Sequence, residues 1–200
     1  MRKVFLLAWL GIILSGIGYI FWHEDWKYSL PTPVPENYNP AQPGDVIRIS
    51  DKIKSEGDKP LFVHFFNPAC PCSRFNVPHF RSLVRKYGDQ LNFAVVVMSA
   101  DRMYTEEEIR DKFDLETIPV FFDKAIADSC GVYSTPQAVL LDTRQKLYYR
   151  GNYNKSRYCA DKGTNYAQMA IDSLLDNKSN LITDQAALKS YGCTLPTCTK

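Results

Sequence analysis

Short apolar runs and amphipathic segments alternate along the chain from about residue 46 to residue 175. The runs at 61–66 and 91–98 are almost entirely apolar, which is typical of strands that are covered on both faces. The segment at 165–175 places its apolar side chains on one face, as an amphipathic helix does. In full, the pattern predicts strands at 46–49, 61–66, 91–98, 120–122, 137–141 and 146–150, and helices at 73–87, 106–113, 124–130 and 165–175. Strands that alternate with helices and end in a hairpin and a helix predict an α/β sandwich.

The N-terminus carries a separate apolar stretch. Residues 4–22 contain no charged side chain, and at 1.5 Å per residue they are about long enough to cross the hydrocarbon core of a bilayer. Arg2 and Lys3 precede this stretch, whereas Glu24 and Asp25 follow it, so the positive-inside rule predicts a cytoplasmic N-terminus. Because no small-x-small cleavage site follows, we expect an uncleaved transmembrane anchor with the remaining chain outside the cytoplasm.

The composition then divides the chain into four parts. Residues 1–26 form the anchor, and residues 27–44 contain five prolines, which favours an extended, semi-rigid linker. Residues 45–180 are long enough for one domain with a real core, and residues 181–200 form a tail with two cysteines. The 24 basic and 22 acidic residues form no concentrated basic patch, so we expect no nucleic-acid partner.

The strongest chemical signal is a Cys70-Pro71-Cys72 motif between the strand at 61–66 and the helix that follows. The free backbone N–H groups and the positive dipole end of a helix N-terminus favour an anion. For cysteine that anion is the thiolate, its nucleophilic form. Pro71 suits the first position of the helix. Cys70 is therefore the candidate nucleophile.

The order of these motifs resembles the thioredoxin fold, and most of all the membrane-anchored redoxins of the TlpA type. Pro78 lies eight residues after Cys70, and Thr135-Pro136 precedes an apolar strand, as in thioredoxins. The resemblance covers roughly residues 61–177. It implies a thioredoxin-like three-layer sandwich behind the transmembrane helix, anchored in a bacterial inner membrane and facing the periplasm or exterior. It also implies a thiol–disulfide oxidoreductase without a cofactor, whose partners are protein thiols or disulfides.

The resemblance also implies roles for single residues. Cys70 would be the nucleophile, and His64, which stands where thioredoxins carry a buried acid, would transfer protons. Thr135 and Pro136 would line the groove that binds the extended chain of a partner protein, with Pro136 at the position of a cis-proline. An inward core histidine is the structural alternative for His64.

The motif departs from the family at the second cysteine. The usual resolving position falls on Ser73, and Cys72 stands one residue earlier. Residues i and i+2 of a helix point to different sides, so a Cys70–Cys72 disulfide would be strained and easily reduced. Either Cys72, our first choice, resolves the mixed disulfide in a high-potential dithiol, or the resolving cysteine lies elsewhere.

Four further cysteines leave the disulfide map open, because six cysteines allow fifteen full connectivities. Cys130 and Cys159 lie in segments that the thioredoxin fold brings near the active site, so they could pair with each other, or one could resolve Cys70. Cys130 is equally well explained as a small buried hydrophobic residue. Cys193 and Cys198 flank four residues of the tail and could close a small disulfide loop, and both stay possible structural or resolving cysteines.

Other functions fit the motif less well. A Cys-Pro-Cys motif with His64 nearby offers soft ligands for Cu(I), as in Sco-like metallochaperones, although Sco proteins use cysteines four residues apart. A thiol peroxidase of the redoxin family would carry a hydroxyl residue three positions before the cysteine, where this chain has Asn67. A binding domain with inert cysteines is the third alternative.

Overall fold

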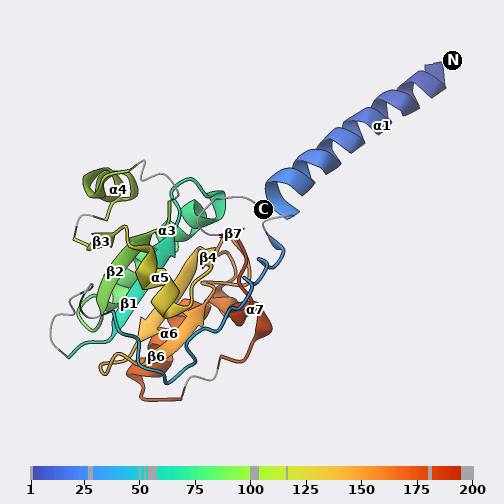
Figure 1. Cartoon of the computed structure of the whole chain (residues 1–200). Coiled ribbons are helices and arrows are strands. Elements are labelled where there is room, and N and C mark those ends of the chain that lie inside the picture. The colour runs from blue at the N-terminus through green and yellow to red at the C-terminus, as the bar shows by residue number, and fades with distance from the viewer. Residues whose placement is uncertain are drawn as a thin grey trace.

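The structure is a computed structural model that describes residues 2–26, 29–49, 51, 53, 58–99, 104–115, 117–179 and 182–194. Cys198, one of the candidate cysteines, lies outside these residues. Figure 1 shows an α/β domain from which one long N-terminal helix extends.

A five-stranded sheet in the order β3-β2-β1-β5-β6 forms the middle of the domain. Its strands are β1 (Leu61–Phe66), β2 (Asn92–Val97), β3 (Val120–Phe121), β5 (Gln137–Leu141) and β6 (Leu147–Gly151). The first three run parallel, β5 pairs antiparallel with β1, and β6 pairs antiparallel with β5. Every residue of β1 and of β5 is buried, which explains why all but His64 and Gln137 are apolar.

Helices cover both faces of this sheet (Figure 1). The main helices are α3 (Pro71–Tyr87), α4 (Glu106–Phe113), α5 (Lys124–Cys130) and α6 (Tyr166–Leu175). One core joins Phe62 of the sheet with Phe80 of α3 and Ile171 of α6. The other core joins Val63 with Ile126 of α5. Alternate residues of β1 thus face opposite layers, and the expected three-layer, thioredoxin-like sandwich is confirmed.

Local sequence signals explain where several elements begin and end. Thr105 caps α4 through a reciprocal capping box with Glu108. Gly131 ends α5 in the left-handed conformation, with φ of +69°. Pro78 lies inside α3, as the sequence predicts. The Thr135–Pro136 peptide bond is cis, so that expectation is confirmed as well.

The N-terminal helix α1 (Arg2–Phe21) has 20 residues, none of them buried, and an 18-residue window within it has a mean hydropathy of 2.3. A π-helical turn, η1 (Trp22–Trp26), follows it. Length and composition make α1 able to cross a membrane. The orientation of the helix and the identity of the membrane stay predictions.

Two segments differ from the expected picture. The strand predicted at 46–49 is reduced to a single bridge between Val46 and Lys146. The proline-rich linker also contacts the tail and the domain, since the Thr32 N–H donates to the Ser190 carbonyl of the tail at 2.8 Å and the Tyr38 hydroxyl donates to the Gly131 carbonyl of the domain.

The described part of the tail folds back onto the domain. It forms α7 (Gln185–Leu188) and β7 (Cys193–Thr194), and β7 pairs with the short strand β4 (Ser134–Thr135). The tail is therefore in contact with the segment that precedes Pro136.

Candidate functional site

Cys70 lies between the end of β1 and the first turn of α3, where the sequence places it. A tight turn holds it there: the Cys70 N–H donates to the Asn67 carbonyl at 3.0 Å, and the Asn67 side-chain oxygen accepts from the Ala69 N–H at 2.9 Å. The Ser73 hydroxyl closes the turn by accepting from the Asn67 N–H at 3.1 Å. Ser73 stands where the thioredoxin motif is expected to have its second cysteine, and here its hydroxyl helps to fix the turn.

Cys70 forms a disulfide with Cys193, which lies 123 positions later in the chain, with 6.5 Å between the two Cα atoms. Both cysteines are buried. This corrects two expectations, because Cys70 is joined neither to Cys72 nor to the cysteines at 130 and 159, and Cys193 is not joined to Cys198. The physical reason is that the tail returns to the N-terminal end of α3, which no short-range pattern in the sequence indicates.

A short antiparallel pairing brings Cys193 to this place. Thr135 stands opposite Cys193 and Ser134 opposite Thr194, directly before the cis-proline Pro136. Thr135 and Pro136 therefore lie at the site, as expected. Their neighbour in the structure is the chain's own tail.

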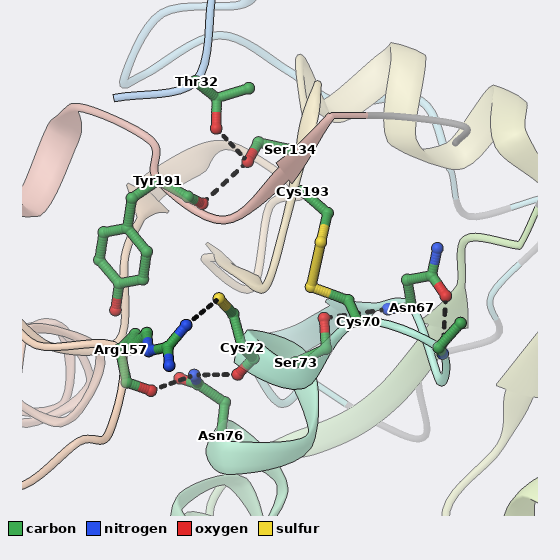
Figure 2. Close-up of a disulfide and its surroundings, with 11 residues drawn as sticks. Thr32, Asn67, Cys70, Cys72, Ser73, Asn76, Ser134, Arg157, Tyr191 and Cys193 are labelled. Atoms are coloured by element: carbon green, nitrogen blue, oxygen red, sulfur yellow. Dashed lines mark hydrogen bonds between the residues drawn. A yellow bond between two sulfur atoms is a disulfide. The ribbon is translucent and has the colours of Figure 1, made fainter. Parts of the chain in front are cut away.

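Cys72 packs in one small buried cluster with Cys70 and Cys193, and its sulfur faces Arg157 (Figure 2). Its Sγ lies 3.8 Å from Nη1 of Arg157, whose side chain is only 6% exposed. Nη2 of Arg157 also pairs with a carboxylate oxygen of Asp25 at 2.9 Å and donates to the Tyr158 hydroxyl at 2.8 Å. Burial lowers the pKa of Arg157, but its hydrogen bond to Tyr158 and the neighbouring Cys72 and Asp25 together raise that pKa above its usual value, so the guanidinium beside the Cys72 sulfur stays charged.

Asn76 ties these groups together from the next turn of α3. Its Nδ2 donates to the Cys72 carbonyl at 2.9 Å and to the Arg157 carbonyl at 3.3 Å. Its Oδ1 accepts from the Cys159 thiol at 3.1 Å. Burial raises the pKa of Cys159 to about 12, so at neutral pH this thiol stays protonated and able to donate.

Cys130 belongs to the other side of the sheet. It is buried in the core under α5, and burial raises its pKa to about 12 despite the lowering effect of Arg150. Cys159 packs against the opposite core, so the structure does not bring these two cysteines together. The interpretation of Cys130 as a small buried hydrophobic residue is confirmed.

His64 lies on β1 and faces the core under α3. Its ring stacks on Phe80, with centroids 4.7 Å apart, and on Phe66, and its Nδ1 lies 2.7 Å from the Tyr153 hydroxyl. Burial, together with the charge of His79, lowers the pKa of His64 to about 3. The imidazole is therefore neutral at neutral pH. Among the described residues no hydrogen bond joins it to a cysteine, and its role in proton transfer stays a prediction.

Sequence reasoning missed three residues that shape this site. Cys193 was named as a possible structural or resolving cysteine, but the only specific pairing proposed for it was a local loop with Cys198. Neither Arg157 nor Tyr153 had been assigned a partner. The sequence does contain a signal for Arg157 and Tyr153, because the segment 152–159 is unusually polar and aromatic for a loop. Nothing in the sequence connects that segment to α3.

Metal binding gains no support from the geometry. Among the described residues, no group of three or more His, Cys, Asp or Glu side chains is arranged to hold a metal ion. The Cu(I) alternative stays a prediction.

Comparison with known proteins places the chain in a family. A family model described as "Domain of unknown function (DUF6436)" matches residues 42–196. The chain belongs to this family. A search of curated proteins found no match.

Solved structures extend the comparison at the level of the fold. A hypothetical protein, SMc02350, from Sinorhizobium meliloti is 21% identical, with a TM-score of 0.59 over 70% of this chain and 80% of its own. An uncharacterized conserved protein from Geobacillus kaustophilus is 20% identical, with a TM-score of 0.59 over 82% of this chain and 92% of its own. A thioredoxin-like protein in its oxidized form, 20% identical, matches 74% of this chain and 97% of its own with a TM-score of 0.49. At these identities the likeness concerns the fold, so the function has to be argued from the site.

Proposed function

We propose that the chain is a membrane-tethered thiol–disulfide oxidoreductase that acts outside the cytoplasm on protein thiols or disulfides, with Cys70 and Cys193 as its redox-active pair. The observation that carries this proposal is the disulfide between Cys70, at the N-terminus of α3, and Cys193, which pairs with the residue before the cis-proline. In a thioredoxin-like fold this is the position where thiol exchange is expected. The location outside the cytoplasm is supported by α1 and by the charges that flank it.

The proposed chemistry is ordinary thiol–disulfide exchange. In the reducing direction, the Cys70 thiolate attacks one sulfur of a partner disulfide, forms a mixed disulfide and expels the other partner sulfur as a thiolate. Cys193, once deprotonated, then attacks Cys70 Sγ, expels the second partner sulfur and leaves the Cys70–Cys193 disulfide. Two electrons and two protons pass from this chain to the partner. The reverse sequence oxidises a partner dithiol.

The local structure supports the roles of both cysteines. Cys70 is the N-cap residue of α3, where the positive end of the helix dipole favours a thiolate, and a stabilised thiolate is also a better leaving group. Cys193 is on the tail, so it approaches Cys70 from outside the helix. The poor i, i+2 geometry of Cys72 is thereby avoided.

The test is disulfide mapping by mass spectrometry of the full chain in detergent micelles, equilibrated across a series of glutathione redox poises. We expect one reversible disulfide, mapped to Cys70 and Cys193, and we expect its loss in Cys193→Ser. Cys130→Ala is the matched control, because Cys130 lies in the opposite core, and it should leave the transition unchanged. A Cys70 that stays reduced at every poise, or that pairs with another cysteine, would contradict the proposal.

The proposed location has its own test. When protease is added to spheroplasts of a bacterium that expresses the chain, we expect degradation of the α/β domain and protection of a tag placed before Arg2. Inside-out vesicles should give the reverse pattern. Protection of the domain in spheroplasts would contradict a location outside the cytoplasm.

A further inference from the structure

The tail occupies the edge of β4 in the way that an extended segment of another protein would. Cys193 is in register with Thr135. Figure 2 shows its sulfur bonded to that of Cys70. Backbone pairing at a strand edge gives affinity, whereas the side-chain and backbone shape beside it gives specificity. The oxidised chain thus holds its own cysteine-bearing segment where the proposed function requires that of a partner.

Gly192, directly before Cys193, fits this place in a way that no other residue does. Its φ of +104° is a conformation that residues with a side chain rarely adopt. A Cβ atom at this position would also overlap the carbonyl oxygen of Thr135. Both the conformation and the close approach therefore require glycine before the cysteine.

The part of the tail before Gly192 is fixed independently of the disulfide. The Ser134 hydroxyl donates to the Tyr191 carbonyl at 2.9 Å, and the Tyr191 hydroxyl donates to the Asn154 carbonyl at 3.0 Å. Ser190 accepts from the Thr32 N–H through its carbonyl and bonds to the Gln137 side chain through its hydroxyl. Cys193 and Thr194, by contrast, are held by the β4 edge and by Cys70. Gly192 lies at the border between these two parts.

We propose that the β4 edge beside Cys70 is a docking site for an extended protein segment with glycine directly before its reactive cysteine, and that residues 192–194 of this chain compete for the same site. The proposal rests on the proposed oxidoreductase function. To that function it adds a class of partner segment, with glycine before the cysteine, and competition between that segment and the chain's own tail. The partner segment follows the backbone path that the tail takes in the oxidised chain. The tail leaves when Cys193 is reduced and returns when Cys193 resolves the mixed disulfide.

In this arrangement, the step that resolves the mixed disulfide also releases the partner protein. When the Cys193 thiolate attacks Cys70 Sγ, the bond between Cys70 and the partner sulfur breaks, and the partner leaves as a thiolate. The same movement returns residues 193–194 to the β4 edge, from which they displace the partner's backbone. One disulfide is formed and one is broken, and no further oxidant or reductant takes part.

The first experiment compares two peptide disulfides as oxidants of the reduced full chain in detergent micelles. The probes are the symmetric disulfides of acetyl-Tyr-Gly-Cys-Thr-amide and acetyl-Tyr-Ala-Cys-Thr-amide. We expect oxidation by the glycine peptide to be about tenfold faster, because the alanine must adopt an unfavourable conformation against the Thr135 carbonyl. Equal rates would overturn the docking site. If neither peptide nor glutathione disulfide oxidises Cys70, the proposed function itself fails.

The second experiment tests the competing tail with Gly192→Ala. The variant chain is mixed in reduced form with the glycine peptide disulfide, quenched with acid at intervals and analysed by intact mass. We expect the mixed disulfide between Cys70 and the peptide to resolve about tenfold more slowly than in the unmodified chain, since the tail no longer fits beside Thr135. Resolution at the unmodified rate would overturn the competition. The peptide comparison uses the unmodified chain, so it stands even where this variant folds poorly.

Discussion

At the scale of single residues, the site contains a positive charge in an unusual place. Arg157 is nearly buried, and it lies between the sulfur of Cys72 and the carboxylate of Asp25. Its ring neighbours are Phe75 and Tyr158, with the guanidinium carbon 5.5 Å and 4.8 Å from their centroids. A buried charge in this setting is costly unless its partners compensate it. Its position next to Cys72 thus indicates that it affects the reactivity of that thiol.

We predict that Arg157→Gln slows the alkylation of Cys72 by iodoacetamide at pH 7 by about tenfold, because removing a nearby positive charge lowers the thiolate fraction. Arg157→Lys keeps the charge and should recover much of the rate. The measurement is peptide-resolved mass spectrometry of the reduced chain, with the complete alkylation of Cys72 after denaturation as the internal reference. An unchanged rate for Cys72 would mean that Arg157 acts through packing alone.

His64 gives a second prediction at this scale, which concerns pH. The pKa of His64 is about 3 in the folded chain, against about 6.5 for an ordinary unfolded histidine. Between these values the unfolded state binds more protons, so the free energy of unfolding falls as pH decreases from about 6.5 toward 3, by up to about 1.4 kcal/mol per pH unit from this group. Above about pH 6.5 the group makes no pH-dependent contribution.

This effect can be isolated with His64→Phe, which retains an aromatic ring beside Phe66 and Phe80. Urea unfolding of both chains between pH 5 and pH 8 should show a steeper loss of stability for the unmodified chain below pH 6.5. Parallel curves would show that His64 does not stay neutral on folding. The comparison also removes the contributions of other titrating groups, which the two chains share.

At the scale of elements, the cap of α4 offers a prediction that does not involve the site. Thr105 accepts from the Glu108 N–H at 3.1 Å, and Glu108 returns a bond to the Thr105 N–H. We predict that Thr105→Ala lowers the free energy of unfolding by about 1 kcal/mol, while Thr105→Ser costs less, because serine also caps helices. The redox transition of Cys70 should not change in either variant. A shift of that transition would indicate that α4 contributes to the site.

The elements also show what the sequence could and could not predict. Long apolar runs and clear caps predicted β1, β2, β5 and all four main helices to within about two residues, since periodicity and capping are local signals. The two-residue strands β4 and β7 have no periodicity of their own. Their pairing depends on contacts between positions about 60 residues apart, which a single sequence does not reveal.

The same limit explains the outcome for the site. Cys70 was predicted because its signal, a strand followed by Cys-Pro at a helix start, is contained in a dozen residues. The pairing of Cys70 with Cys193 was not predicted, because no spacing rule connects two cysteines that lie 123 positions apart. The proline at 136 was recognised through the resemblance to thioredoxins. The tail strand beside it is a property of this chain that the resemblance does not contain.

At the scale of the whole molecule, the disulfide closes most of the domain into one loop. Cys70 and Cys193 enclose α3 to α7 and β2 to β6, so the unfolded chain loses much conformational freedom when the bond is present. We predict that reduction lowers the free energy of unfolding by about 2–4 kcal/mol. The oxidised form would then be the more stable one, and the reduced form the one in which the tail is able to leave β4.

Urea unfolding of the full chain in micelles, with and without dithiothreitol, measures this difference. Cys70→Ser serves as the control, because it lacks the bond and should give the same curve under both conditions. Cys130→Ala, by contrast, should keep the full difference, since Cys130 takes no part in the disulfide. If reduction leaves the stability of the unmodified chain unchanged, contacts such as those of Tyr191 and Ser190 are sufficient to hold the tail. In that case the departure of residues 192–194 would require a partner segment that competes for the β4 edge, and reduction alone would not release them.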